Sequence, residues 1–403
     1  MSTHQTMDTA GARPARLSLT QGERKASMLL ALLFACRMLG LFLLTPVFAV
    51  AAQALPGGND AARVGLALGA YGLTQAVLQI PLGMASDRFG RRPVIVLGMV
   101  LFVIGGVVCA LASSVDWVTV GRCIQGLGAV SAAISAWVAD STRPEVRTRA
   151  MAMVGGSIGI SFAVSLVLSP VLVGQFGLSG LFWAISLLGF VCLLIAAFVV
   201  PSAPKAPVSA IKVTATQVLR HADLLRLNFG VFCLHFILMS LFIVVPGVLA
   251  TLGAYGTEDL WKVYLPVILA SFVLMVPAVF YTETRKRHKQ ALELAVLLLI
   301  VVLASMPWAR VSLAPMVAAL VLFFIGFNIL EALQPSLVSR VAPPEYKGLA
   351  LGFYNTSQSL GVFGGGLVGG LLASHGQVQW VLWTGAGLAA LWLLTARGFK
   401  DKY

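Results

Sequence analysis

Long apolar runs dominate the pattern of hydrophobic and polar positions along this chain. A bilayer core about 30 Å thick requires roughly 20 apolar residues per helix, so a run of that length predicts one membrane-spanning helix. Twelve such runs cover residues 28–51, 62–84, 93–113, 117–139, 150–173, 179–201, 226–250, 262–281, 291–308, 312–334, 348–373 and 378–397. The pattern therefore predicts an all-α, polytopic membrane protein with twelve transmembrane helices.

The composition narrows the class of protein further. Of the 403 residues, 59% are hydrophobic and only 11% are charged, whereas about 25% are charged in a typical soluble domain. So low a charged fraction excludes a water-soluble enzyme. The sequence has no clustered nucleophile or His/Asp pair, so it does not indicate a membrane-bound enzyme either. The net charge of +13 would suggest a nucleic-acid partner in a soluble protein. Because no arginine-rich or aromatic-interleaved segment accompanies it, we expect no nucleic acid.

The basic residues instead indicate how the chain crosses the membrane. With an internal N-terminus, the two tails and five loops on that side hold 23 of the 28 Lys and Arg residues, whereas the outer loops hold only Arg63, Lys262 and Arg310. This positive-inside distribution predicts that both termini are cytoplasmic. The first run is too long for a signal peptide and precedes no small-residue cleavage site, so we expect it to be retained as a span.

The chain divides into two similar halves. The predicted connection 202–225 begins Pro-Ser-Ala-Pro-Lys-Ala-Pro and separates six runs from six. At an offset of 200 residues, Leu41, Phe42 and Pro46 match Leu241, Phe242 and Pro246, and Pro144-Glu145 matches Pro344-Glu345. Internal repeats of this kind indicate secondary transporters. The predicted domains are an N-terminal tail (1–27), a six-helix bundle (28–201), a linker (202–225), a second six-helix bundle (226–397) and a C-terminal tail (398–403).

The connection between the second and third runs carries a specific motif. It reads Gly-Met-Ala-Ser-Asp-Arg-Phe-Gly-Arg-Arg-Pro from Gly83 to Pro93, and its GxxxDRxGRR spacing resembles the signature loop of the major facilitator superfamily. The resemblance covers nearly the whole chain and implies two six-helix bundles around a central cavity. It also implies a conformational latch that contains Gly83, Asp87, Arg88, Gly90, Arg91, Arg92 and Asp140.

Two contacts of this latch can be argued from charge. The carboxylate of Asp87 can accept hydrogen bonds from free N–H groups at a helix start, and the resemblance implies the start of the eleventh run, near Lys347. Arg91 can pair with Asp140 at the inner end of the fourth run. Both contacts would lock the halves together when the outside is open, so we interpret these residues as a switch rather than as substrate ligands.

A few titratable residues lie inside predicted spans and are candidates for proton coupling or for charges in the cavity: Arg37, Arg122, His235 and Glu331. A charge within a span is costly unless it is paired or faces a cavity. Arg37, near mid-membrane, is the strongest cavity candidate, and the alternative is a buried pair with Glu331. Arg122 opens an RxxxGxG stretch that resembles the fourth-span motif of the family, which is tied to proton coupling; alternatively, it snorkels to the outer interface.

His235 is open to three interpretations. It titrates near neutral pH and can transfer a proton, or it packs with a single hydrogen bond. With Met239 one turn further on and Cys233 close by, it also resembles a soft-metal set, which leaves copper transport as an alternative. Because no second Met or Cys pair accompanies it, we expect no bound metal and no cofactor besides the coupling proton. The five cysteines all lie in apolar runs and are expected to pack there.

Polar side chains on two helix faces are candidates to line the substrate path. Tyr71, Gln75 and Gln79 follow one another at i, i+4 and i+8 on the second run. The complete set of predicted cavity residues is Tyr71, Gln75, Gln79, Asn328, Tyr354, Asn355 and Gln358. The alternative for all of them is hydrogen bonding between helices.

The segment from Asn328 to Gly366 resembles the YajR-type branch of bacterial drug–proton antiporters. The resemblance implies a monomer in a bacterial inner membrane that exports small amphipathic or apolar compounds in exchange for protons. Only Gly155 and Gly159 fit the antiporter motif GxxxGPxxGG of the fifth span, so a proton symporter that imports a metabolite or a soft metal remains an alternative. We expect the soluble C-terminal domain of that branch to be absent, because the chain ends directly after the twelfth run.

Overall fold

The computed structural model describes residues 18–201, 215–253, 255–343 and 346–399. The parts of the predicted tails and linker that fall on 1–17, 202–214 and 400–403 lie outside the described residues, as does the Pro344-Glu345 half of the repeat. The described residues form helices and short connections without a strand, as the continuous apolar runs predict.

The N-terminal half contains the first six predicted spans. Its helices are α1 (Gln21–Phe42), α2 (Phe48–Ala51), α3 (Ala61–Phe89), α4 (Arg91–Ala110), α5 (Val115–Leu127), α6 (Ser131–Asp140) and α7 (Pro144–Leu194), which ends in a π-helical turn (Ile195–Val199). Gly90, with φ of 96°, separates α3 from α4. Because glycine alone adopts this φ without strain, Gly90 of the signature loop sets the turn between these two helices.

Two features interrupt the regular succession of spans. The fourth predicted span is broken, since α5 ends at Leu127 and α6 begins at Ser131. The fifth and sixth runs together make up the 51 residues of α7, which Gly177 divides into two helices because its φ of 66° and ψ of −176° are not helical. Because about 20 residues suffice to cross a bilayer, the break at Gly177 divides α7 into two spans.

The C-terminal half contains the other six spans. Its helices are α8 (Ala215–Leu219), α9 (Ala222–Gly253), α10 (Trp261–Arg285), α11 (His288–Ala309), α12 (Leu313–Val341), α13 (Lys347–Ser374) and α14 (Val378–Arg397). Within the described residues, ten helical segments are long and apolar enough to cross a membrane. Segment 149–199 counts as one of these ten, although Gly177 divides it into two spans. Helix α13 is not among the ten, because its glycines and polar residues lower its mean hydropathy. With both taken into account, the protein has twelve spans in two bundles of six.

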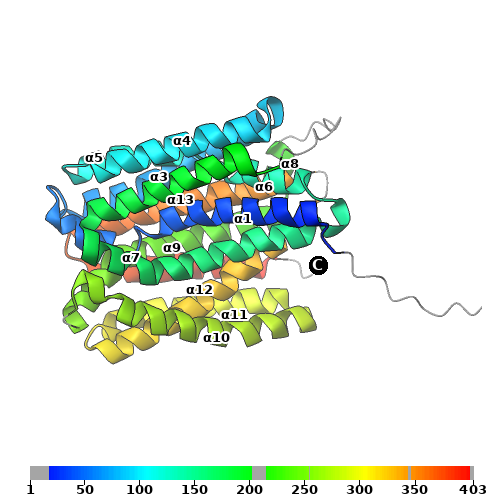
Figure 1. The fold of residues 1–403 in the computed structure, drawn as a ribbon. Coiled ribbons are helices and arrows are strands. Elements are labelled where there is room, and N and C mark those ends of the chain that lie inside the picture. Colours follow the sequence, from blue (N-terminus) through cyan, green and yellow to red (C-terminus); the bar gives the residue numbers. More distant parts are fainter. Residues whose placement is uncertain (1–17, 202–214, 254, 344–345, 400–403) are drawn as a thin grey trace, which may run out of the picture.

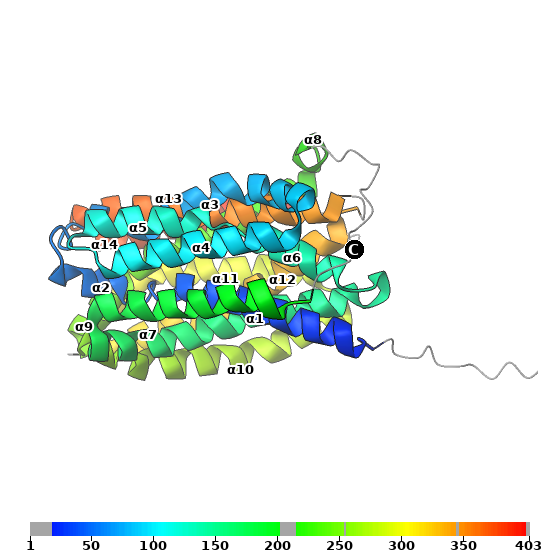
Figure 2. The ribbon, with the colours of Figure 1, turned by 45° about the horizontal axis from the view of Figure 1, so that its top comes forward.

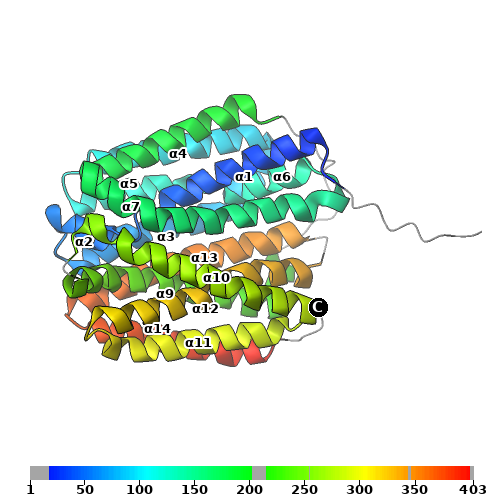
Figure 3. The ribbon, with the colours of Figure 1, turned by 60° about the horizontal axis from the view of Figure 1, so that its bottom comes forward.

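The two halves lie side by side as separate groups of helices. Figure 3 shows α1 and α3–α7 on one side and α9–α14 on the other. The start of α1 and the C-terminus lie at the same end of the bundle (Figures 1 and 2), as an even number of crossings requires. We call this end the termini end; it is the end that the positive-inside distribution predicts to be cytoplasmic.

At the end opposite the termini, the halves are tightly closed. Glycines of α3 and α13 meet there: a Cβ at Gly65 would clash with the carbonyl oxygen of Gly366, and a Cβ at Gly366 would lie 3.0 Å from the Cα of Gly69. Toward the termini end, a Cβ at Gly348 or Gly352 of α13 would meet no atom within 4 Å. Helices α3 and α13 therefore diverge toward the termini end. This is the inward-facing arrangement for the orientation that the positive-inside distribution predicts.

Candidate transport site

Arg37 on α1 is buried in the interior of the N-terminal half. Its side chain is 1% exposed, and its Nη1 donates a hydrogen bond to the hydroxyl of Ser131, the first residue of α6. Its Nε and Nη2 have no hydrogen-bond partner, and its guanidinium lies 5.9 Å from the ring centroid of Tyr71. Among the described residues no ion pair joins Arg37 to Glu331, so the predicted alternative of a buried pair between them is wrong for this conformation.

Arg122 on α5 lies close to the same tyrosine. Its guanidinium is 4.7 Å from the Tyr71 centroid, and its Nη1 donates to Gln125 Oε1 at 3.0 Å. Because Arg122 is 1% exposed, it does not reach the outer interface, and the snorkelling alternative is wrong. The sequence analysis did not single out Ser131 or Gln125, because a serine and a glutamine in apolar runs give no signal of the arginines beside them.

His235 on α9 brings together residues from three helices of the C-terminal half. Its Nδ1 lies 3.2 Å from the carbonyl oxygen of Val231, and its Nε2 lies 2.7 Å from Gln358 Nε2 on α13. A carbonyl only accepts, so Nδ1 carries the proton, and Nε2 of the neutral ring accepts from the Gln358 amide. Glu331 Oε2 on α12 lies 3.7 Å from the same Nε2 and has no hydrogen-bond partner.

This arrangement can respond to a proton. If His235 Nε2 is protonated, it becomes a donor toward Glu331, and the Gln358 amide must turn its oxygen toward the ring. If Glu331 is protonated instead, its carboxyl group becomes a donor. Either event changes the contacts between α9, α12 and α13. The titratable pair is thus His235 and Glu331, a pairing that the sequence analysis did not predict.

The predicted cavity residues divide into three groups. Tyr71, Gln75 and Gln358 line a cavity of about 10 Å³ together with His235, Met38, Leu41, Gly72, Ser359 and Val362. Gln79 and Tyr354 are buried with unpartnered polar atoms, and Asn355 is half-buried. Asn328 instead donates to Ser271 on α10 at 3.1 Å, which fits the alternative of hydrogen bonding between helices. The cavity is lined by residues of both halves but has room for one water molecule at most.

Aromatic side chains close the interior between the halves. Phe162 of α7 packs against Phe324 and Phe327 of α12, with centroid distances of 5.8 Å and 5.6 Å. Phe42 of α1 meets Phe162 edge-on at 5.1 Å, and Phe327 lies 6.1 Å from His235. A phenylalanine within an apolar run does not differ in sequence from one that faces lipid, so this cluster could not be predicted.

A metal site receives no support from the arrangement around His235. Cys233 and Met239 are both buried on α9. Among the described residues, no group of three or more His, Cys, Asp or Glu side chains could hold a metal ion. The copper alternative therefore rests on sequence spacing alone.

The signature loop at the termini end forms one of its two predicted contacts. Arg91 Nε lies 2.8 Å from Asp140 Oδ2, which confirms that predicted pair, and Arg91 also binds Asp87 and Ser86. Because α4 and α6 both belong to the N-terminal half, the expectation that this pair locks the two halves together is wrong. Among the described residues, Asp87 makes no hydrogen bond to the start of α13 at Lys347. That predicted contact is not formed here, because α3 and α13 diverge at this end.

The other members of the loop hold it in place. Arg92 donates to the carbonyl oxygen of Val200 and lies over the ring of Trp137, and Arg88 lies over Phe89. A Cβ at Gly83 would lie 3.4 Å from the methyl carbon of Ala132, which is an ordinary van der Waals distance.

The Asp87→Asn variant should insert and fold normally but transport at least about tenfold more slowly. The asparagine amide keeps the shape of the side chain but removes its negative charge. This charge binds Arg91 and can accept hydrogen bonds from the positive start of α13. A charge-assisted hydrogen bond of this kind contributes about 1.5–3 kcal/mol net. Asp116→Asn, which removes an exposed carboxylate paired with Arg63, is the matched control. Transport assays on both variants reconstituted at equal amounts test this, and a normal rate for Asp87→Asn would refute the latch role.

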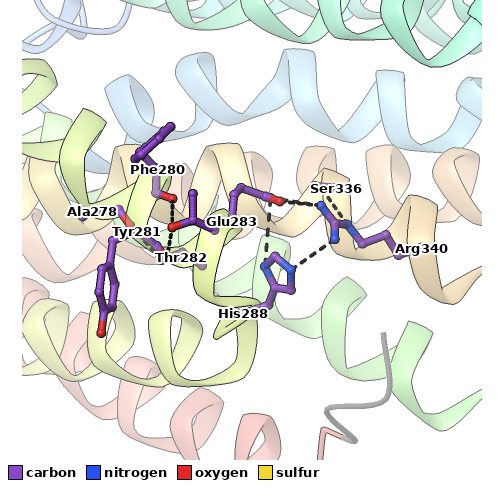
Figure 4. A network of polar contacts seen from close by, with 9 residues as sticks. Ala278, Phe280, Tyr281, Thr282, Glu283, His288, Ser336 and Arg340 are labelled. Atoms are coloured by element: carbon purple, nitrogen blue, oxygen red, sulfur yellow. Dashed lines mark hydrogen bonds and ion pairs between the residues drawn. The ribbon is translucent and has the colours of Figure 1, made fainter. Parts of the chain in front are cut away.

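A second charged network occupies the termini end of the C-terminal half (Figure 4). Arg340 of α12 donates to both carboxylate oxygens of Glu283 on α10, at 3.0 Å and 2.8 Å, and lies 3.1 Å from Nε2 of His288 on α11. In the N-terminal half, Arg91 binds two acids, Asp87 and Asp140. Here, Arg340 instead binds one acid and one buried histidine. The sequence analysis missed this network because its residues do not repeat the spacing of the signature loop.

Comparisons with known proteins bear directly on this architecture. The family model described as Major Facilitator Superfamily matches residues 30–365 and 331–402. "Inner membrane transport protein YajR" of Escherichia coli (strain K12) is 42% identical over 387 residues, which cover 95% of this chain and 85% of that protein. "Multidrug resistance protein MdtH" of Aeromonas hydrophila is 28% identical over 336 residues, which cover 81% of this chain and 83% of that protein.

Solved structures share the same fold. A bacterial homologue of the human lysosomal transporter Spinster, in an inward-facing and occupied conformation, superposes with a TM-score of 0.77 at 14% identity. The superposition covers 96% of this chain and 99% of that one.

Proposed function

The chain belongs to the Major Facilitator Superfamily, and on this premise we propose that it exports small amphipathic or apolar compounds in exchange for protons. The protein is a membrane transporter and not an enzyme. The proposed cycle alternates between the present arrangement, closed at the end opposite the termini, and one in which that end opens. We further propose that it works as a monomer in a bacterial inner membrane, with both termini in the cytoplasm.

The single observation that carries the proton coupling is the contact between His235 and Glu331. Both side chains are largely buried, with 2% and 19% exposure, and they lie 3.7 Å apart without an arginine between them. Ionisable residues within a membrane-spanning bundle are costly, and they commonly mark ion and proton pathways. A proton taken up here changes hydrogen bonds among α9, α12 and α13, and α13 is the helix whose glycines close against α3.

The signature loop is proposed to stabilise the other state of the cycle, in which the end opposite the termini is open. When α13 moves toward α3 at the termini end, its start approaches Asp87, and the closure at Gly65 and Gly366 is released. Protonation of the His235–Glu331 pair and the contact of Asp87 with α13 would thus act on the same helix, so that each can shift the balance between the two states of the carrier.

The test is transport by the purified protein in proteoliposomes with an imposed pH gradient. A panel of amphipathic, apolar, cationic and anionic compounds is offered, and accumulation is followed in each. A gradient of about one pH unit sustains about a tenfold concentration ratio for a one-for-one exchange. Accumulation against the direction of proton flow supports the proposal, accumulation with the proton flow indicates symport, and flux that ignores the gradient contradicts proton coupling.

A further inference from the structure

We propose that the interior at the break between α5 and α6 binds an acidic group of the transported compound, so that the substrate is an amphipathic organic anion. This inference deepens the proposed function, since it rests on the central interior being the transport path. It does not depend on the direction of transport or on the coupling ion.

The first observation is an excess of positive charge without a carboxylate to balance it. Arg37 and Arg122 are both 1% exposed and both lie within 6 Å of the centroid of Tyr71, at 5.9 Å and 4.7 Å. Among the described residues, neither arginine forms an ion pair. Glu331, the acid that could have paired with Arg37, lies beside His235 instead. Buried charges are normally paired, so two guanidinium groups against one ring indicate a partner that arrives from outside the protein.

The second observation is the helix break itself. The first hydrogen bond of α6 runs from the Ile134 N–H to the Val130 carbonyl, so the N–H groups that precede it have no partner inside the helix. The residue before α6, Val130, has no polar side chain with which to cap them. In transporters, the positive N-terminal end of an interrupted helix commonly faces an anionic group of the substrate.

Arg37 connects these two observations. Its Nη1 donates to the hydroxyl of Ser131, so the guanidinium lies at the positive start of α6, where its Nε and Nη2 remain without partners. A cation beside the N-terminal end of a helix is unfavourable. A carboxylate, sulfonate or phosphate bound there would satisfy both the unpartnered guanidinium nitrogens and the free N–H groups of the helix.

The surroundings indicate the rest of the ligand. Tyr71, whose ring both arginines approach, also lines the small cavity between the halves, together with the apolar side chains of Met38, Leu41 and Val362. A compound with an anionic head at Arg37 would therefore place an apolar body along these residues. In the present conformation the cavity of about 10 Å³ is too small for such a compound, so binding requires the halves to separate.

The experiment compares two fluorescent probes that share one apolar group. Dansylglycine carries a carboxylate and dansylcadaverine carries an ammonium, and their binding to the full-length protein in nanodiscs is followed by fluorescence anisotropy. We expect saturable binding of dansylglycine, at least about tenfold tighter than that of dansylcadaverine. We expect Arg37→Gln to weaken dansylglycine binding by about tenfold or more, because it removes a charge-assisted hydrogen bond.

Further variants separate recognition from folding. Arg37→Lys should bind dansylglycine more tightly than Arg37→Gln does, because it keeps the positive charge. Ser131→Ala, which keeps both arginines, should weaken dansylglycine binding only a few-fold. The control Arg285→Gln, at an exposed arginine of α10, should bind like the wild type. Gel filtration and thermal unfolding identify any variant that has failed to fold.

Three results would overturn the inference: no saturable dansylglycine binding, equal or tighter binding of dansylcadaverine, or an Arg37→Gln variant that is folded and binds dansylglycine normally. Proton-coupled transport of cationic compounds in the proteoliposome assay would also overturn it, while leaving the proposed function intact. Conversely, dansylglycine binding without any response to a pH gradient would support the anion site and contradict proton coupling.

Discussion

Replacing Glu331 with glutamine should abolish gradient-driven accumulation of substrate while exchange of labelled for unlabelled substrate continues. Glutamine matches the size of a protonated glutamate but neither takes up nor releases a proton. A carrier with this side chain still alternates with substrate bound, so exchange persists, but the pH gradient can no longer do work on the cycle. The accumulation ratio should fall from about tenfold, for one pH unit and one-for-one exchange, to unity.

The measurement uses the same vesicles for both assays. Accumulation is recorded under an imposed pH gradient, and exchange is recorded with equal substrate and equal pH on the two sides. Glu293→Gln, at a partly exposed carboxylate of α11, is the matched control and should behave like the wild type. If Glu331→Gln still accumulates substrate in response to the gradient, Glu331 does not carry the coupling proton.

Replacing Gly366 with valine should shift the protein toward the state that is open at the end opposite the termini. The added side chain would meet the backbone of Gly65 and Gly69, so the contact between α3 and α13 could not form as it does here. Overpacking of this kind costs about 1–3 kcal/mol, which corresponds to a change of roughly 5–150-fold in the balance of two states. Transport should slow, because one half of the cycle becomes unfavourable.

The populations can be measured with spin labels at Asn59 and His375, near the outer ends of α3 and α13, after the five native cysteines are replaced. Gly366→Val should lengthen the distance between the labels. Gly387→Val is the control, because a Cβ at this exposed glycine would meet no atom within 4 Å. We expect Gly352→Val, on the part of α13 that closes against α3 in the other state, to shorten the mean distance. An unchanged distance in Gly366→Val would contradict the gate.

The sequence predicted the helical fold well because bilayer thickness imposes one length on every span. Gly83 and Asp87 to Arg92 identified the family on spacing alone, and the branch resemblance is confirmed by the YajR relative. One detail escaped this reasoning. The break before Ser131 lies within the predicted run 117–139 and does not change its hydropathy, which was the signal used. The interruption of α7 at Gly177, by contrast, falls in the predicted gap between the runs 150–173 and 179–201.

The interior was predicted less completely, because pairing depends on how helices rotate against one another. The sequence identified Arg37, Arg122, His235 and Glu331 as charges that do not suit a membrane. A pair of Arg37 with Glu331 was the alternative to a cavity charge, whereas the structure places Glu331 beside His235, and Arg37 beside Ser131 and the ring of Tyr71. The Asp87 contact with α13 requires these two helices to approach each other at the termini end, where they diverge in this structure.

The central claim is that substrate and protons move in opposite directions through one alternating site. It is tested most directly by recording proton movement itself, in vesicles that contain a trapped pH indicator and have no imposed pH gradient. A transported compound is loaded inside wild-type vesicles, and its efflux into compound-free buffer is started by dilution. The account predicts that the lumen acidifies as the compound leaves, and that Glu331→Gln vesicles show no pH change. A lumen that stays at constant pH, or becomes alkaline, during efflux from wild-type vesicles would contradict it.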